Sequence, residues 1–269
     1  MLESATLGSS HRISFGMSSL MELDTVESLI LTCRDCGLDF IELNANFPHY
    51  VRETLHRRNT LSLLEQEGID YSVHLPETLD FGVFQSEFRD AAVSMIAGFC
   101  DLVKPGTRFV YHMNSGIPVR LPDEQVFLYK RYEHEYLDAL EETISVVSAI
   151  LDGEGCSLCI ENLGNFSLPH IFKGVELMLS LPSVGLLWDI GHDTSSGLSD
   201  TPFFLNHLDD VKELHLHDSD GKNDHLPLGS GKADIENALS FADERALPVV
   251  VEVKTVEALK QSVAYLGRR

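Results

Sequence analysis

The sequence has little positive charge and lacks any long apolar run. Only 20 of its 269 residues are Lys or Arg, against 42 Asp and Glu, which gives a formal net charge of −22. A surface this acidic repels the phosphates of nucleic acid, so we expect a small-molecule substrate and not DNA as the partner. No apolar run approaches the roughly 18 residues that span a bilayer, so we expect no membrane partner either.

The sequence is also poor in cysteine and in targeting signals. Its five cysteines, an odd number, favour free thiols in a reducing compartment over a disulfide framework. The first residues, MLESATLGSSHRISFG, do not show the cationic and then apolar segments of a secretory signal peptide. We therefore expect a cytoplasmic protein.

Two Cys-x-x-Cys pairs raise the question of a zinc or redox site. Cys33 and Cys36 fall in a helical pattern, where residues three apart share a face. Cys156 and Cys159 fall in a strand pattern, where residues three apart point to opposite faces and cannot chelate one ion. The spacing therefore favours core thiols over a metal or redox role.

Short apolar or β-branched runs alternate with longer helical patterns along the whole chain. Eight such strand–helix units in about 250 residues predict an α/β fold, a single (β/α)8 TIM barrel formed by residues 1–269 as one domain. A doubly wound open sheet is the alternative, but no G-x-G-x-x-G turn follows the first strand. The expected strands are 13–17, 40–43, 71–75, 109–112, 158–161, 185–189, 213–217 and 249–253. The expected helices are 25–36, 51–67, 88–103, 123–151, 175–180, 202–208, 235–244 and 256–266.

The third to the eighth of these strands all end in His, Asp or Glu. In a (β/α)8 barrel the carboxyl ends of the strands meet at one face, where the active site lies. A single polar residue at a strand end is usually a helix cap, but six at one rim crowd imidazoles and carboxylates into one cavity. Because clustered carboxylates without a cation must protonate or repel one another, the convergence predicts a divalent metal site. The strand-end residues are His74, His112, Glu161, Asp189, His215 and Glu252.

Four further residues near these strand ends are candidates for substrate binding. His217 lies two residues after His215, so both side chains share a face, and His217 either supports a ligand or contacts substrate. Glu42 ends the second strand and either binds substrate, supports a ligand or is structural. His192 and Lys222 are expected to contact substrate oxygens.

The strand-end segments VHLPE, YHMNSG, IENLG, LWDIGHD, HLHDSDGKNDHLPLGSG and VVEVK resemble those of the xylose isomerase-like barrels. That superfamily includes sugar isomerases and epimerases and the AP endonuclease family 2, which is related to endonuclease IV. The resemblance implies zinc or manganese, with magnesium as an alternative, and one to three ions. The epimerase pattern implies one ion held by Glu161, Asp189, His215 and Glu252. The endonuclease IV pattern adds His74, His112, His192 and His225, with Asn223 in place of one expected Asp and Asp224 beside it.

The two branches imply two different reactions. The expected one is isomerisation or epimerisation of a small sugar or related hydroxy-carbonyl compound, in which the metal stabilises an enediolate while Glu161 and Glu252 exchange the proton. The alternative is zinc-dependent phosphodiester hydrolysis of the endonuclease IV type. A barrel that only binds its ligand is disfavoured, because open metal positions usually serve chemistry.

Overall fold

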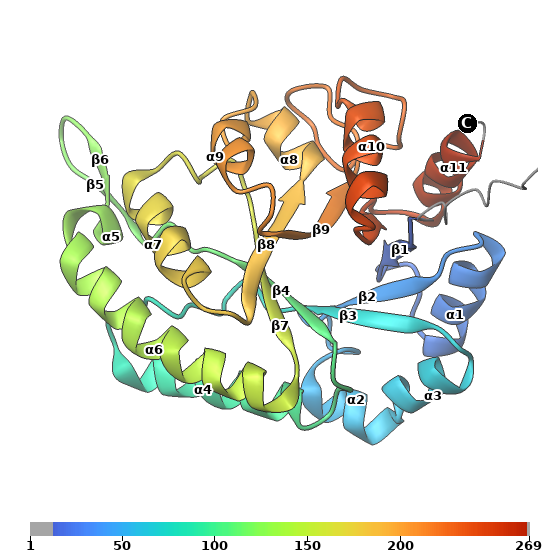
Figure 1. The fold of residues 1–269 in the computed structure, drawn as a ribbon, viewed down its shortest axis with the longest axis horizontal. Helices are drawn as coiled ribbons and strands as arrows, with labels where there is room; N and C mark the ends of the chain where they lie inside the picture. The colour runs from blue at the N-terminus through green and yellow to red at the C-terminus, as the bar shows by residue number, and fades with distance from the viewer. Residues whose placement is uncertain (1–12, 268–269) are drawn as a thin grey trace, which may run out of the picture.

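Eight parallel strands close into a barrel with helices around it in the computed structural model, which describes residues 13–267 (Figure 1). The order around the barrel is β1-β10-β9-β8-β7-β4-β3-β2, so each strand lies beside its neighbour in the chain and the first pairs with the last. The predicted (β/α)8 fold is confirmed, and the open sheet is excluded. The barrel strands are β1 (Phe15–Ser18), β2 (Phe40–Asn44), β3 (Asp70–His74), β4 (Arg108–His112), β7 (Ser157–Glu161), β8 (Val184–Asp189), β9 (Val211–Leu216) and β10 (Val249–Val251).

Four of the described helices begin where a side chain accepts a hydrogen bond from one of the first backbone amides. The Thr25 hydroxyl accepts from the Ser28 amide at the start of α1, and the Thr255 hydroxyl accepts from the Ala258 amide at the start of α11. None of the described helices is both long and apolar enough to span a bilayer. The helices are α1 (Val26–Asp35), α2 (Arg52–Arg58), α3 (Thr60–Gln66), α4 (Ser86–Cys100), α5 (Leu128–Arg131), α6 (Glu133–Glu154), α7 (Pro169–Leu179), α8 (Ile190–Ser195), α9 (Thr201–Asn206), α10 (Ile235–Arg245) and α11 (Val256–Leu266).

Three of the expected helices differ from the observed ones, and α8 was not expected; the helix expected at 175–180 begins six residues earlier, at Pro169. The helix expected at 51–67 is split into α2 and α3, because Asn59 between them adopts a left-handed conformation with a φ of 56°. The helix expected at 123–151 begins ten residues later, at Glu133. Before it lie α5 and an antiparallel hairpin of β5 (Pro118–Arg120) and β6 (Gln125–Phe127), in which Val119 pairs with Val126.

The barrel interior holds a small apolar layer formed by Val110, Cys159 and Leu187, separate from the larger core between strands and helices. Gly16 leaves space for the Phe40 ring, since a Cβ there would lie 2.6 Å from it. All five cysteines are free, and those of the two Cys-x-x-Cys pairs are buried except Cys36, which is half-buried. Among residues 13–267 the groups of metal-ligand type contain only His, Asp and Glu.

A buried ion pair also lies inside the barrel. Arg108 Nε, at the start of β4, donates to Glu213 Oε2 at 2.8 Å, and the Glu213 side chain is fully buried. Burial raises the pKa of Glu213 although the Arg108 charge opposes the shift. Removal of one partner of such a pair leaves the other charge unpaired in the interior, so loss of either residue should destabilise the fold.

We expect Arg108→Met to lower the free energy of unfolding by about 3–5 kcal/mol at neutral pH. The loss should be smaller near pH 5, because more of Glu213 is then protonated. A carboxyl whose pKa is raised by folding lowers the free energy of unfolding once the pH rises above its unfolded pKa of about 4.3. Urea unfolding at the two pH values measures both effects. The double variant Arg108→Met/Glu213→Leu should recover most of the loss, and a single variant as stable as the wild type would contradict the prediction.

Candidate metal centre

The eight expected metal ligands lie together at the carboxyl end of the barrel. Together with His217 they form three groups, and within each group the donor atoms lie within 4.8 Å of one another; Glu161 and Glu252 each belong to two groups. The structure therefore brings together the residues that the strand ends and the family resemblance single out, with His217 beside them, and their role as ligands stays a prediction. The groups are His74, His112 and Glu161; Glu161, Asp189, His215 and Glu252; and His192, His217, His225 and Glu252.

The first group is a tight triangle of donor atoms. His112 Nε2 lies 3.1 Å from His74 Nε2 and 2.9 Å from Glu161 Oε2, and the third side of the triangle is 3.4 Å. A zinc ion with bonds of 2.0–2.1 Å separates its tetrahedral ligands by about 3.3 Å. His74 Nδ1 faces the Leu75 carbonyl oxygen at 2.9 Å, which leaves its Nε2 to the triangle. The triangle therefore fits a small divalent cation.

The second group converges on His215. Its Nδ1 atom lies 3.2 Å from Glu252 Oε2, 3.3 Å from Glu161 Oε1 and 3.8 Å from Asp189 Oδ2. Nevertheless His215 Nδ1 and Glu252 Oε2 are buried and have no hydrogen-bond partner of suitable geometry. Buried donor atoms that converge without bonding to one another are the arrangement expected of ligands around an ion, so this group fits a divalent metal as well.

Glu42 determines which nitrogen of His215 faces the group. Its Oε2 atom lies 3.2 Å from His215 Nε2, and it also accepts from the Ser72 hydroxyl at 3.4 Å. Because the Nε2–H donates to Glu42, Nδ1 is the nitrogen that points at the three carboxylates. Contacts of this kind orient metal-ligating histidines from behind, which favours a supporting position for Glu42 over a substrate contact.

His217 supports Asp189 in a similar way. Its Nδ1 accepts from the His225 backbone amide at 2.8 Å, so its Nε2 carries the proton that is donated to Asp189, 3.0–3.1 Å away. Both ring nitrogens are thus used within the protein, which favours a positioning role over a ligand role for His217. Gly191 makes the packing possible, because a Cβ there would lie 2.0 Å from the His217 ring.

His192, a member of the third group, also lies near the second group and near a loop residue that the sequence left undecided. His192 Nε2 lies 3.8–3.9 Å from Glu161 and Asp189 oxygens, and its Nδ1 lies 3.4 Å from Asp224 Oδ2. Asn223 instead donates to Asp220. Asp224, and not Asn223, is therefore the residue of this loop that reaches the site.

A lysine that sequence reasoning missed also contacts the site. Lys254 Nζ lies 3.1 Å from Glu252 Oε1, which leaves Glu252 Oε2 to face His215. The signal was available, because Lys254 lies two residues after Glu252. Lys222, the expected substrate contact, lies on the exposed loop after β9, and no contact between its side chain and the three groups is found among residues 13–267.

The concentrated negative charge of the carboxylates alters the protonation of the histidines. Burial lowers the pKa of His74, but the bond to Glu161 and its charge outweigh burial and raise that pKa to about 9. The surrounding carboxylates likewise raise the pKa of His215, against burial. Burial raises the pKa of Glu161, yet the charges of His215 and His112 bring it well below its usual range. Without an ion, protons on imidazole provide the balancing positive charge.

Metal binding should therefore release protons from the site. We expect zinc binding near pH 7 to release at least one proton, because His74 must deprotonate before its Nε2 can bind an ion. The apparent affinity should rise between about pH 6 and pH 9. Calorimetric titrations in buffers of different ionisation enthalpy measure the release, and binding without proton release would contradict the prediction.

Glu42→Gln should weaken metal binding by about 10–100-fold while the barrel stays folded. An amide cannot support the His215 imidazole as a carboxylate does, although it fits the same space. Competition with a fluorescent zinc chelator gives the affinity, and circular dichroism checks the fold. Glu257→Gln on the exposed face of α11 is the matched control, and equal affinities of the two variants would argue against a role for Glu42.

The comparisons with known proteins point to one family. The family described as Xylose isomerase-like TIM barrel matches residues 30–269 by sequence. A search of curated proteins gives no match. The resemblance drawn from the strand-end segments is confirmed by the family match.

Solved structures of sugar epimerases share the fold. A D-tagatose 3-epimerase-like protein superposes with a TM-score of 0.75 at 21% identity, covering 95% of this chain and 96% of that chain. For 3-keto-D-glucoside 4-epimerase from E. coli the TM-score is 0.73 at 14% identity, with 96% and 100% covered. For D-psicose 3-epimerase from Clostridium cellulolyticum H10 it is 0.69 at 15% identity, with 95% and 98% covered. At these identities the likeness shows a common fold.

The sequence match and the structure agree on the same architecture. The match covers most of the chain, and the described residues form the closed parallel barrel with His, Asp and Glu at the carboxyl ends of its strands. The chain belongs to the xylose isomerase-like TIM barrel family.

Proposed function

We propose that this chain is a divalent-metal-dependent isomerase or epimerase of a small sugar or a related hydroxy-carbonyl compound. The observation that carries the proposal is the second ligand group, in which Glu161 and Glu252 approach His215 Nδ1 from two different strands. The epimerases whose structures share this fold support the choice of reaction class.

The donors of the second group suit an ion that also binds substrate. Three carboxylates and one imidazole match the preferences of zinc and manganese, with magnesium as the alternative. When bound, the ion supplies Lewis-acid stabilisation for negative charge on neighbouring substrate oxygens.

The two glutamates are the candidate proton carriers. The charges of neighbouring histidines hold the pKa of Glu161 and of Glu252 well below its usual range against the opposing effect of burial, so both are ionised and able to accept a proton. They stand on β7 and just after β10, on either side of His215. A substrate carbon between them can lose its proton to one carboxylate, and the other can return a proton once it has taken one up from a substrate hydroxyl or from solvent.

Other residues of the chain hold these two carboxylates in place. Lys254 binds one oxygen of Glu252, and the triangle with His74 and His112 fixes Oε2 of Glu161. Asn162 bonds to both the backbone amide and the carbonyl of Asp189, at 2.7 and 3.1 Å, so the ends of β7 and β8 stay in register. Because its charged groups are already in place, the site needs little reorganisation when charge develops on the substrate.

Glu161→Gln and Glu252→Gln should each lower turnover by at least about 100-fold. The assay is a panel of ketoses and aldoses in deuterated buffer with zinc or manganese supplied, in which epimerisation through proton exchange places deuterium at the reacting carbon. Glu257→Gln, on the exposed face of α11, should match the wild type. Turnover without deuterium incorporation would contradict proton exchange.

One observation favours a second candidate, phosphodiester hydrolysis of the endonuclease IV type. The His74–His112–Glu161 triangle offers donors for an ion beyond the one that the epimerase reaction requires. The net charge of −22 opposes binding of a nucleic-acid backbone. Metal analysis separates the two: one ion per chain supports the isomerase, whereas two or three zinc ions together with nicking of an abasic-site duplex, abolished in Glu161→Gln, would replace it with the hydrolase.

A further inference from the structure

Carboxylates outnumber cations in the loops around the three ligand groups. We refer to the segments that join a barrel strand to the next helix or hairpin at this end as the mouth loops. They are residues 19–25, 45–51, 75–85, 113–117, 162–168, 217–234 and 252–255. Their acidic residues are Glu22, Asp24, Glu77, Asp80, Asp218, Asp220, Asp224, Asp234 and Glu252, and their basic residues are Lys222, Lys232 and Lys254. A substrate therefore approaches the site through a negative potential.

The three lysines do not reverse this sign. Lys254 Nζ lies 3.1 Å from Glu252 Oε1, so its charge is paired inside the site. Lys222 and Lys232 both belong to the loop 217–234, which also contains four Asp and has a net charge of 2 − 4 = −2. The loop with the most cations is thus still an acidic one.

The two helices that follow the last barrel strands begin against carboxylates of the chain itself. The Val256 amide, the first of α11, donates to Glu22 Oε2 at 2.7 Å. The Asn237 amide, in the first turn of α10, donates to Asp234 Oδ1 at 3.3 Å. These helices follow β9 and β10, the seventh and eighth strands of the barrel, where barrels that bind phosphate commonly hold it at a helix N-terminus. A phosphate at either helix start would here lie against a carboxylate.

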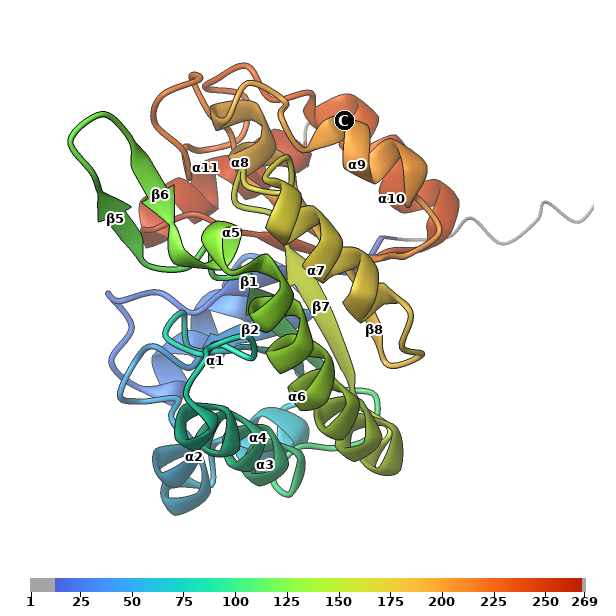
Figure 2. The same cartoon turned by 90° about the vertical axis from the view of Figure 1, so that its left-hand side faces the viewer.

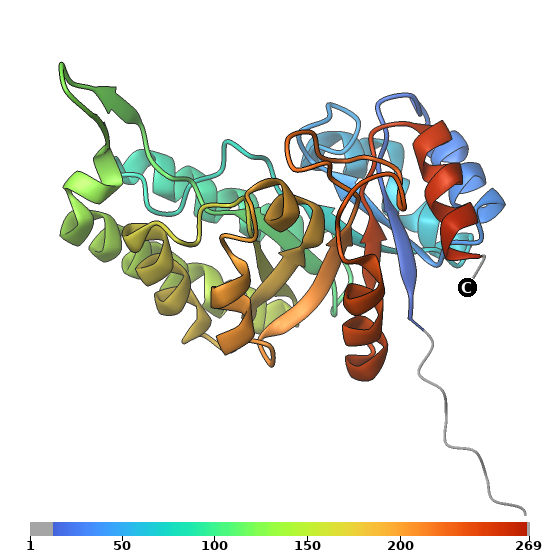
Figure 3. The same cartoon turned by 90° about the horizontal axis from the view of Figure 1, so that it is seen from above.

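The start of α11 lies close to the ligand groups. The loop 217–234 packs along α11, and the Leu228 amide donates to the Ser262 hydroxyl at 3.1 Å (Figures 2 and 3). Residues 252–255 join Glu252 of the second group directly to this helix. Glu22, which binds the first amide of α11, therefore belongs to the mouth of the site.

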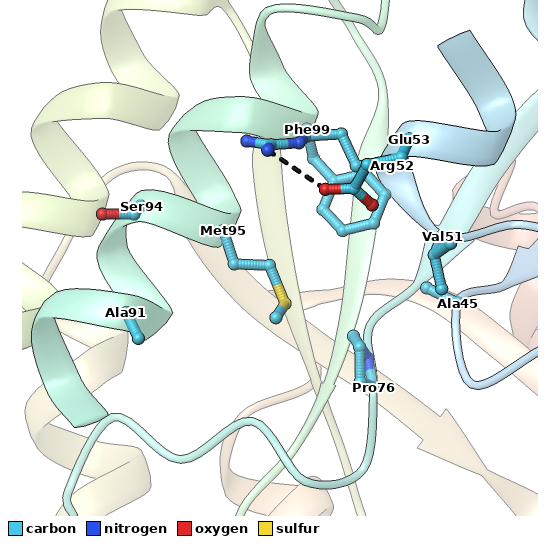
Figure 4. Close-up of a pocket in the computed structure, with 9 residues that line it drawn as sticks. All are labelled: Ala45, Val51, Arg52, Glu53, Pro76, Ala91, Ser94, Met95 and Phe99. Atoms are coloured by element: carbon cyan, nitrogen blue, oxygen red, sulfur yellow. Dashed lines mark hydrogen bonds and ion pairs between the residues drawn. The ribbon is translucent and has the colours of Figure 1, made fainter. Parts of the chain in front are cut away.

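A pocket beside the ends of β2 and β3 contains an arginine, but its charge is also paired. The pocket has a volume of about 380 Å³, lies between α2 and α4, and has Ala45 and Pro76 in its wall (Figure 4). Arg52 and Glu53 are the charged residues of that wall, and Arg52 Nη2 donates to Glu53 Oε1 at 3.2 Å. The guanidinium is thus neutralised by its neighbour in the chain.

We infer that the site takes an uncharged substrate, a free sugar or polyhydroxy carbonyl compound, and excludes the corresponding phosphate ester. The assignment to a sugar rests on the function proposed above, whereas the exclusion of anions rests on the charges of the mouth. A bound divalent ion does not reverse the sign, because the three carboxylates of the second group leave a charge of 2 − 3 = −1. Glu22 is the specificity-determining residue, because its carboxylate takes the position at the start of α11 that an anion would need.

Paired substrates test this selection. Ketoses and aldoses are assayed beside their phosphate esters, for example D-fructose beside D-fructose 6-phosphate, with manganese supplied. We expect kcat/KM to be at least about 100-fold lower for the ester than for the free sugar, because like charges that meet at a binding surface oppose binding strongly. An increase in NaCl from about 20 to about 300 mM should narrow this difference, since salt screens the repulsion.

A charge-removing variant tests the part played by Glu22. Glu22→Gln should raise the ratio of kcat/KM for the ester to kcat/KM for the free sugar by about 5-fold, because the start of α11 then favours an anion. Glu141→Gln on the exposed face of α6 removes the same charge and is the matched control, with the ratio of the wild type. Equal ratios in the two variants would overturn the role of Glu22.

The outcomes separate a failure of the selection from a failure of the proposed reaction. Esters that are turned over as well as the free sugars would overturn the selection and keep the isomerase. If neither panel is turned over, the isomerase is contradicted, and a titration of the manganese-loaded wild type with inorganic phosphate decides the selection. An unchanged melting temperature up to about 10 mM phosphate supports the exclusion of anions, whereas saturable stabilisation would overturn it.

Discussion

The carboxylates and imidazoles that are buried at the carboxyl end of the barrel must neutralise one another, and the structure of this end depends on that constraint. Glu161, Asp189 and Glu252 are at most 7% exposed, and ionised carboxylates cannot remain in such an interior without compensating charge. Protons on His74 and His215 supply that charge in the chain alone, and a divalent ion supplies it when bound. The same need for neutralisation arises towards the amino end of the barrel, where Arg108 compensates the charge of Glu213. The two charged regions also act on each other, since the charge of Glu42 raises the pKa of Glu213 and the charge of His215 lowers it.

Much of the fold and the position of the site follow from the sequence. The eight strands were recognisable from their apolar runs, and parallel pairing brings their carboxyl ends to one face, whatever the details of the loops. The β5–β6 hairpin was not recognisable, because residues 123–132 have a helical pattern and only the pairing of Val119 with Val126 makes part of them a strand. The break at Asn59 was likewise invisible in a continuous amphipathic pattern.

The roles within the site depend on side-chain geometry that residue types do not specify. The histidine spacing placed His217 beside His215, but only the His225 amide at its Nδ1 shows that His217 has no free nitrogen. The choice between Asn223 and Asp224 depends on the turn in which Asn223 bonds to Asp220. Lys222 and Lys254 both follow strands that contribute ligands, and only the short connection after β10 keeps Lys254 next to Glu252.

The pairing of β1 with β10 also determines when the second ligand group can be completed during folding. Glu252 directly follows β10, and the barrel closes only when this last strand inserts between β1 and β9. The pairing of β1 with β10 joins segments more than two hundred residues apart, which is a slow contact for a folding chain. Until it forms, His74, His112 and Glu161 can already be adjacent, whereas Glu252 is missing from the second group. An ion that binds during synthesis would thus meet an incomplete set of ligands. Tight metal binding would therefore indicate a chain whose barrel has closed.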